Sequence, residues 1–134
     1  MRPPAIEKWH ELAKARDARG LDTLLDDSVV FESPVVHTPQ AGKAITTKYL
    51  TSALVVLNNE HFRYVGEWFG PTSGVLEFAT EIDGVKINGV DIITWNADDR
   101  ITHFKVMVRP LKAVNMLHQM MAAQLAAQVS SSPG

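Results

Sequence analysis

An acidic residue inside an apolar run is the clearest chemical signal in this 134-residue sequence. Asp91 stands between Val90 and Ile92. In a strand, where side chains alternate between faces, it would share a face with Ile93 and Trp95. A carboxyl buried there would have a raised pKa, because burial disfavours its charged form, and could donate or accept a proton near neutral pH. We therefore take Asp91 as the first candidate catalytic or anchoring residue, against the alternative that its face of the strand is turned to solvent.

Histidine is the natural base at neutral pH, and the chain contains five. His37 follows the turn at Pro34, and His10 precedes Ala13 by about one helical turn. Either could supply a base near Asp91, although a solvated surface histidine is the plainer interpretation of both. No two histidines have the spacing of metal ligands, and no acidic cluster joins them. The sequence therefore predicts neither a metal nor a cofactor.

The amino-acid composition excludes several kinds of site and several classes of protein. The chain has no cysteine, which excludes disulfides, cysteine zinc sites and thiol nucleophiles. Its net charge is −2 and it has no dense run of Lys or Arg, which argues against nucleic-acid binding. No apolar run approaches the roughly 20 residues that span a bilayer, and the N-terminus does not resemble a signal peptide. We expect a cytoplasmic protein with no membrane partner.

Hydrophobic spacing and turn residues divide the chain into helices and strands. Glycine or asparagine follows the first and third predicted helices, and proline follows the first and last predicted strands. The expected helices span 4–19, 21–25, 44–57 and 111–128. The expected strands span 28–32, 61–69, 73–82, 86–96 and 101–109. Residues 1–128 should form a single domain, with 129–134 as a frayed, disordered tail.

The order of these elements predicts an α+β fold. Strands of nine or more residues must bend to stay within a small domain, and Gly66, Gly74 and Gly89 are natural places for kinks or bulges. We expect a cone-shaped, curved antiparallel sheet packed with three helices from the N-terminal half, plus a C-terminal helix. A bent sheet with helices on its concave side leaves a cavity at one end, where core residues also form the pocket wall.

Two long stretches and a shorter one resemble the nuclear transport factor 2-like superfamily, near its ketosteroid isomerase and SnoaL-like polyketide cyclase branches. One stretch is RDARGLDTLLDDSVVFESPVV (16–36), and the other is GVDIITWNADDRITHFKVMV (89–108). The shorter one is the helix start at Gly42 after a proline-containing loop. The resemblance extends to about Arg109 and implies the same cone fold, but this fold supports many unrelated functions.

The ketosteroid isomerase pattern is only partly present. Where that pattern has its general base, an Asp before a Pro, this chain has Ser33, which cannot act as an unaided base near neutral pH. Where it has an oxyanion-donating Tyr, the chain has Ala13; its protonated Asp matches Asp91. The SnoaL cyclase pattern implies an acidic residue near the final strand, where Phe104 and Val106 stand, and the Arg-x-Asp pair of limonene epoxide hydrolases is missing.

These patterns predict a SnoaL-like protein that binds an apolar small molecule in the cone. The alternative is a cofactor-free isomerase, cyclase or dehydratase in which Asp91 works with His37, His10 or a bound water. The outward phase of Ile101, His103, Lys105, Met107 and Arg109 lies on the convex face, through which the resemblance implies a homodimer. Expected ligand contacts are Trp9, Ala13, Phe31, Ser33, Tyr49, Trp68, Phe78, Ile93, Trp95, Phe104 and Val106.

Overall fold

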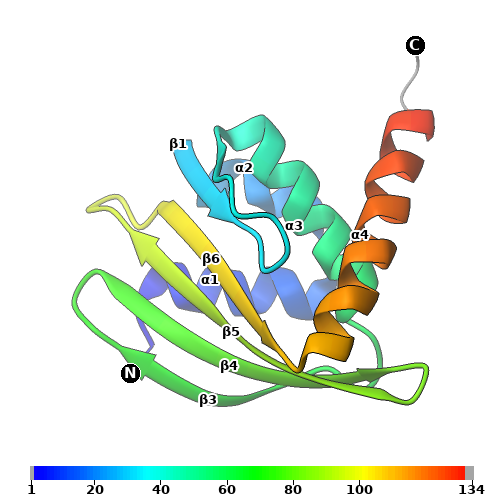
Figure 1. Cartoon of the computed structure of the whole chain (residues 1–134). Coiled ribbons are helices and arrows are strands. Elements are labelled where there is room, and N and C mark those ends of the chain that lie inside the picture. Colours follow the sequence, from blue (N-terminus) through cyan, green and yellow to red (C-terminus); the bar gives the residue numbers. More distant parts are fainter. Residues whose placement is uncertain (1, 132–134) are drawn as a thin grey trace.

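One curved sheet organises the part of the chain that the computed structural model describes, residues 2–131 (Figure 1). Its six strands follow the order β2-β1-β6-β5-β4-β3. They are β1 (Leu25–Glu32), β2 (Gln40–Ala41), β3 (Arg63–Phe69), β4 (Ser73–Ile82), β5 (Val85–Trp95) and β6 (Ile101–Arg109). The helices are α1 (Pro4–Ala15), the 3-10 turn η1 (Ala18–Gly20), α2 (Leu21–Leu24), α3 (Lys43–Leu57) and α4 (Leu111–Ser131).

The predicted α+β architecture is confirmed, with several differences in detail, one of which is the short strand β2 that the sequence analysis does not expect. The sheet is mixed, because β1 pairs with β6 in parallel while β3, β4, β5 and β6 form an antiparallel meander. The first helix stops at Ala15, earlier than predicted, because Arg16 adopts a left-handed conformation with φ of 54°. At the other end α4 continues to Ser131, and residues 132–134 of the expected tail lie outside the described residues.

Strand β5 is the most regular part of the sheet, and its side chains alternate strictly between buried and more exposed positions. Asp91, Ile93 and Trp95 are all buried on its inner face, as the alternation in the sequence predicts. Strand β6 behaves differently, because a bulge near Thr102 pairs Ile101 with Trp95 and buries Ile101 completely. The prediction that Ile101 lies outward is therefore wrong, since the bulge shifts the alternation by one residue.

The helices cover the concave side of the sheet (Figure 1). Helix α1 contributes Trp9, whose ring meets that of Phe104 on β6 edge to face at 4.9 Å. Helix α4 packs beside α3, with Leu117 buried and the Gln128 side chain donating a hydrogen bond to the Lys48 carbonyl at 3.1 Å. Among the described residues, no helix is long and apolar enough to cross a membrane. A continuous core therefore joins the helices to the inner face of the sheet.

Of the three glycines expected to bend the sheet, Gly66 adjoins a bulge in β3, whereas Gly74 and Gly89 lie in regular pairing. Gly89 has another role, because a side chain there would collide with its neighbours. A Cβ atom at this position would lie 2.5 Å from Cζ of Phe78 and 2.6 Å from the Met107 carbonyl oxygen. The absence of a side chain at position 89 thus leaves room for the Phe78 ring, which forms part of the cavity wall described below.

We expect Gly89→Ala to lower the free energy of unfolding by about 1–3 kcal/mol, because the added methyl group overpacks the site against backbone as well as side chain. Chemical denaturation would measure the change. Gly70→Ala is the matched control, since a Cβ there meets its nearest atom at 3.6 Å, and its effect should stay within about 0.5 kcal/mol. Equal stability of the two variants would show that this close approach does not constrain the fold.

Candidate functional site

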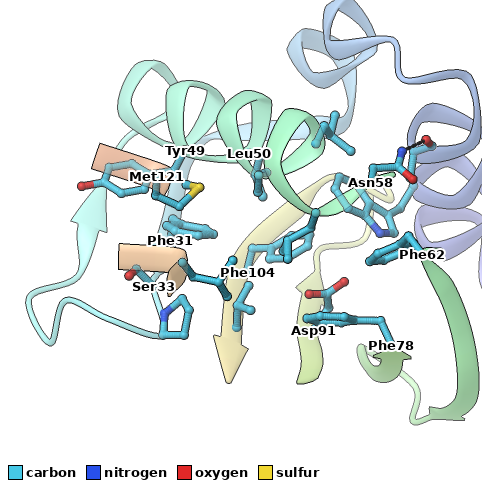
Figure 2. A pocket seen from close by; sticks show the side chains of 18 of the residues that line it. Phe31, Ser33, Tyr49, Leu50, Asn58, Phe62, Phe78, Asp91, Phe104 and Met121 are labelled. Carbon is cyan, nitrogen blue, oxygen red and sulfur yellow. Dashed lines mark hydrogen bonds between the residues drawn. The ribbon is translucent and has the colours of Figure 1, made fainter. Parts of the chain in front are cut away.

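A cavity of about 70 Å³ lies between the inner face of the sheet and helices α1, α3 and α4 (Figure 2). Its wall is mostly aliphatic and aromatic, with Leu50 from α3, Leu117 and Met121 from α4, and Phe62 before β3. Ligand sites in proteins are usually concave, mostly apolar and supplied with a few placed polar groups. This cavity has that composition, so its polar groups decide which chemistry it can perform.

Asp91 is the buried acid of the cavity wall, with only 6% of its surface exposed. Its neighbours across the sheet are Leu76 on β4 and Val106 on β6, which leave it in apolar surroundings. Burial raises the pKa of Asp91 to about 7, and a hydrogen bond from Tyr64 lowers it by a smaller amount. The carboxyl is therefore poised between its neutral and charged forms near neutral pH.

Tyr64, on β3 of the same sheet, donates a hydrogen bond to this carboxyl across the inner face. Its hydroxyl donates to Oδ2 of Asp91 at 2.7 Å and accepts a hydrogen bond from the Trp9 indole N–H at 2.9 Å. Burial, followed by the nearby charge of Asp91, raises the pKa of Tyr64 well above its usual value. The Phe62 and His10 rings pack edge-on against Tyr64, with centroids 5.1 and 5.0 Å away. Tyr64 is therefore a fixed donor to Asp91.

The two oxygens of the Asp91 carboxyl differ in their hydrogen bonds. Oδ2 is occupied by Tyr64, whereas Oδ1 has no hydrogen-bond partner among residues 2–131. Figure 2 shows the carboxyl directed into the space between the aromatic walls. In its neutral form Asp91 can therefore donate a proton from Oδ1, and in its charged form it can accept one there.

The other polar groups of the wall carry no charge. Ser33 accepts hydrogen bonds from the backbone N–H groups of Val35 and Val36, at 3.0 and 3.1 Å. Asn58 donates its amide to the Ala13 carbonyl. Within the described part of the chain, Asp91 is thus the only carboxyl on the wall, and neither a histidine nor an amine joins it. No three His, Asp or Glu side chains in that part converge as metal ligands.

The structure brings together most, but not all, of the residues that the sequence singles out. Besides Asp91, the cavity wall includes Trp9, Ala13, Phe31, Ser33, Tyr49, Phe78, Phe104 and Val106. Ile93 and Trp95 are buried in the core and do not line the cavity. Trp68 is 59% exposed on the outer face, because the bulge in β3 turns it away from the helices.

Neither candidate histidine reaches the cavity. His37 is exposed in the loop between β1 and β2. The imidazole Nε2 of His10 is hydrogen-bonded to Glu67, which also accepts from Arg2 Nε at 3.1 Å. These contacts therefore place neither histidine beside Asp91.

Tyr64, the hydrogen-bond partner of Asp91 on the cavity wall, is a residue that sequence reasoning missed. It follows Phe62 at a spacing of two, which is the signal of a shared strand face. That signal fails further along, because the bulge between Tyr64 and Gly66 also turns Glu67 inward, three residues later. A strict period of two would place Trp68 on the same face as Tyr64, and because of the bulge only Tyr64 lies on the inner face.

Asp91→Asn should change how stability depends on pH. The pKa of Asp91 rises from its ordinary value of 3.8 to about 7 on folding, so folding takes up a proton between these values. The free energy of unfolding of the natural protein should therefore fall as pH rises from about 4 to about 7, and then level off. Asparagine has no charged form, so the variant should gain up to about 4 kcal/mol relative to the natural protein across this window.

Urea denaturation at a series of pH values measures this difference. Asp98→Asn, in the exposed turn between β5 and β6, is the control and should follow the curve of the natural protein. A constant difference between Asp91→Asn and the natural protein from pH 4 to pH 8 would mean that the carboxyl ionises freely in the folded state.

No protein-family model and no curated protein matches this chain. Among solved structures, a steroid delta-isomerase from Pseudomonas aeruginosa is 34% identical, with a TM-score of 0.89 over 95% of this chain and 93% of that one. An uncharacterised protein with a cystatin-like fold from Silicibacter pomeroyi is 26% identical, with a TM-score of 0.81 over 96% of this chain and 87% of that one.

A SnoaL-like protein of unknown function from Burkholderia thailandensis shares the fold at 15% identity, with a TM-score of 0.62 over 78% of this chain and 90% of that one. NTF2-like proteins of unknown function share it as well. The curved sheet, its helical cover and the identity to the Pseudomonas protein along nearly the whole length agree with one another. The chain belongs to the nuclear transport factor 2-like superfamily.

Proposed function

We propose that this protein binds a small, largely apolar molecule that carries a hydrogen-bond-accepting oxygen, such as a ketone. The observation that carries the proposal is the carboxyl of Asp91, held by Tyr64 with one oxygen free in a mostly apolar cavity that has no other charged group among the described residues. A buried ionisable group lowers the stability of a fold. A buried carboxyl with no function would only destabilise the protein, whereas a carboxyl that anchors a ligand contributes to binding.

Binding would depend on the neutral form of Asp91. The protonated carboxyl donates from Oδ1 to the ligand oxygen while Oδ2 continues to accept from Tyr64. When Asp91 loses its proton, two acceptors face each other and the anchor is lost. Because the pKa of Asp91 is about 7, affinity for a neutral ketone should be highest in mildly acidic solution and fall as pH rises through 7.

Isomerisation by proton transfer is the second candidate function. A group with a pKa near 7 can take a proton from carbon beside a carbonyl and return it at another carbon. Similarity to a protein named as a steroid delta-isomerase favours this candidate. However, Asp91 would have to be ionised to act as the base, and it could not then donate to the developing oxyanion. Binding without reaction is therefore the better-supported proposal.

A matched series of probes tests the anchor: bicyclohexyl, which has no oxygen, and 4-cyclohexylcyclohexanone, which has one carbonyl. At about pH 6 we expect the Asp91→Leu substitution to weaken the ketone about fivefold more than the hydrocarbon, because only the ketone loses a hydrogen bond. Asp91→Asn keeps a donor and should retain affinity for the ketone while losing its pH dependence. Titration followed by NMR gives the affinities.

The control is Asp98→Asn, which should leave both affinities unchanged, because its side chain lies in an exposed turn. If Asp91→Leu weakens both probes equally, the carboxyl does not anchor the carbonyl. The isomerase candidate has a separate readout in the same samples, namely deuterium incorporation beside the ketone in D₂O. Incorporation that depends on the protein and disappears in Asp91→Asn would establish proton transfer in place of simple binding.

We further propose a homodimer through the convex face of the sheet, as the resemblance to the superfamily implies. Met107 and Trp68 are 52% and 59% exposed there. Trp68 on β3 pairs with Val75 on β4, and Val75 pairs with Ile92 on β5. Two residues before Ile92, on the same face of β5, Val90 pairs with Met107 on β6. These apolar side chains are therefore neighbours across three pairs of strands. A contiguous exposed apolar patch of this kind is typical of an interaction surface.

Met107→Lys should convert the protein from dimer to monomer at micromolar concentration, because a charge would be buried without a partner in the interface. Sedimentation velocity measures the change in mass. Val55→Lys is the matched control, since Val55 is 60% exposed on α3, away from the convex face, and should leave the mass unchanged. A natural protein that sediments as a monomer would contradict the proposal.

A further inference from the structure

We propose that His10 and Glu67 form a positioning pair, which holds the Tyr64 hydroxyl against Asp91 from outside the cavity. The imidazole of His10 on α1 is hydrogen-bonded to the carboxylate of Glu67 on β3, and neither residue lines the cavity. The inference deepens the proposed function and rests on it, because Asp91 is the proposed anchor for the ligand. The positioning itself can be measured in the protein without a ligand.

Strand β3, which supplies Tyr64, lies at the edge of the sheet and pairs with β4 alone among the described strands. Its register shifts between Tyr64 and Gly66, directly beside the hydrogen bond to Asp91. A bulge disrupts the ladder locally, and an edge strand has ladder hydrogen bonds on one side only. Strand pairing therefore fixes Tyr64 less firmly than it fixes Asp91, which lies on β5 between two partner strands.

Helix α1 supplies the contacts with Tyr64 that strand pairing does not. Trp9 donates to the Tyr64 hydroxyl at 2.9 Å, and the next residue, His10, packs edge-on against the Tyr64 ring. Consecutive helical residues point about 100° apart, so both can reach Tyr64 only while α1 keeps one orientation relative to β3. The hydrogen bond between His10 and Glu67 ties α1 to the same strand, three residues beyond Tyr64. It therefore holds both contacts in place.

The pair of His10 and Glu67 differs from an ordinary surface ion pair. Their side chains are only 15% and 20% exposed. Glu67 also accepts from Arg2 Nε at 3.1 Å, so each of its carboxylate oxygens has a partner in the N-terminal segment. Exposed ion pairs contribute little to stability, whereas removal of one partner from a largely buried pair leaves the other unsatisfied. Loss of the Glu67 carboxylate should therefore displace α1 relative to β3.

Position and charge act on the Asp91 carboxyl in opposite directions. Burial raises the pKa of Asp91, and the hydrogen bond from Tyr64 lowers it by a smaller amount. A displaced Tyr64 would therefore let the pKa of Asp91 rise further. Removal of the negative charge of Glu67 would by itself lower this pKa, because a nearby negative charge disfavours a second one. The direction of the change thus separates positioning from charge.

Two variants of Glu67 make this separation. Glu67→Ala removes both acceptor oxygens, and the Asp91 carboxyl should then titrate about half a pH unit higher than in the natural protein. Glu67→Gln removes the charge but keeps one acceptor oxygen at the same reach, so it should retain most of the natural midpoint. The measurement is carboxyl-carbon NMR of the free protein from about pH 4 to about pH 9. The signal that disappears in Asp91→Asn identifies the carboxyl.

Glu77→Ala is the matched control. The Glu77 carboxylate accepts a hydrogen bond from the Asn88 side chain at 3.0 Å on the outer face of the sheet. This variant therefore also loses one carboxylate and its hydrogen bond, but it leaves the contacts of Tyr64 unchanged. The Asp91 midpoint should stay at its natural value.

Ligand binding gives a second readout. At about pH 6, Glu67→Ala should weaken 4-cyclohexylcyclohexanone about threefold more than bicyclohexyl, because only the ketone depends on the direction of the Asp91 carboxyl. Glu67→Gln should retain most of the natural difference between the two probes. Failure of the proposed function has a different signature, because Asp91→Leu would then not separate the probes while the Asp91 midpoint of Glu67→Ala would still rise.

An unchanged or lower Asp91 midpoint in Glu67→Ala would overturn the positioning role, and a lower one would mean that Glu67 acts through its charge alone. An equal rise in Glu77→Ala would overturn it as well, because Asp91 would then respond to any loosening of the fold. His10→Ala breaks the same hydrogen bond from α1 and should raise the midpoint in the same way. If Glu67→Ala does not fold, an unchanged midpoint in His10→Ala contradicts the proposal.

Discussion

A carboxyl removed from water is the constraint on which the rest of this structure depends. The buried carboxyl of Asp91 accepts a hydrogen bond from the Tyr64 hydroxyl at 2.7 Å, and that hydroxyl accepts one in turn from the Trp9 indole N–H at 2.9 Å. These three side chains come from β5, β3 and α1, which are far apart in the sequence. The curvature of the sheet and the passage of α1 across its concave side are what bring them together (Figure 1).

Burial of Asp91 determines both the pKa of its carboxyl and the stability that the fold loses when this carboxyl ionises. An apolar wall raises the pKa of Asp91 to about 7, which makes the carboxyl useful as a donor near neutral pH and also lowers the stability of the fold when it ionises. The wall offers no second charged group within residues 2–131. For this reason we propose an anchor for a neutral oxygen rather than a complete acid–base pair, although a solved relative is named as an isomerase.

The relation to the superfamily illustrates how a shared fold can carry different chemistry. The resemblance implies a carboxylate and a tyrosine where this chain has Ser33 and Ala13. A tyrosine hydroxyl is nevertheless present in the cavity, because Tyr64 supplies it from β3. The hydroxyl reaches Asp91 from the sheet, and the space above Ala13 is part of the cavity. Ser33 stands where the resemblance implies a base, and its hydroxyl oxygen accepts hydrogen bonds from the backbone N–H groups of Val35 and Val36.

The sequence by itself determined the fold class and placed Asp91 on one strand face with Ile93 and Trp95. Only the structure decided that this face is buried, since burial alternates without a break along β5. The sequence could not determine which residues meet Asp91. Bulges in β3 and β6 shift the alternation by one residue, which turns Trp68 outward and Ile101 inward against the sequence pattern. The hydrogen bond between Tyr64 and Asp91 joins residues 27 positions apart. His10 is hydrogen-bonded to Glu67 and does not line the cavity. Such pairings depend on sheet register and helix placement, which only the tertiary structure decides.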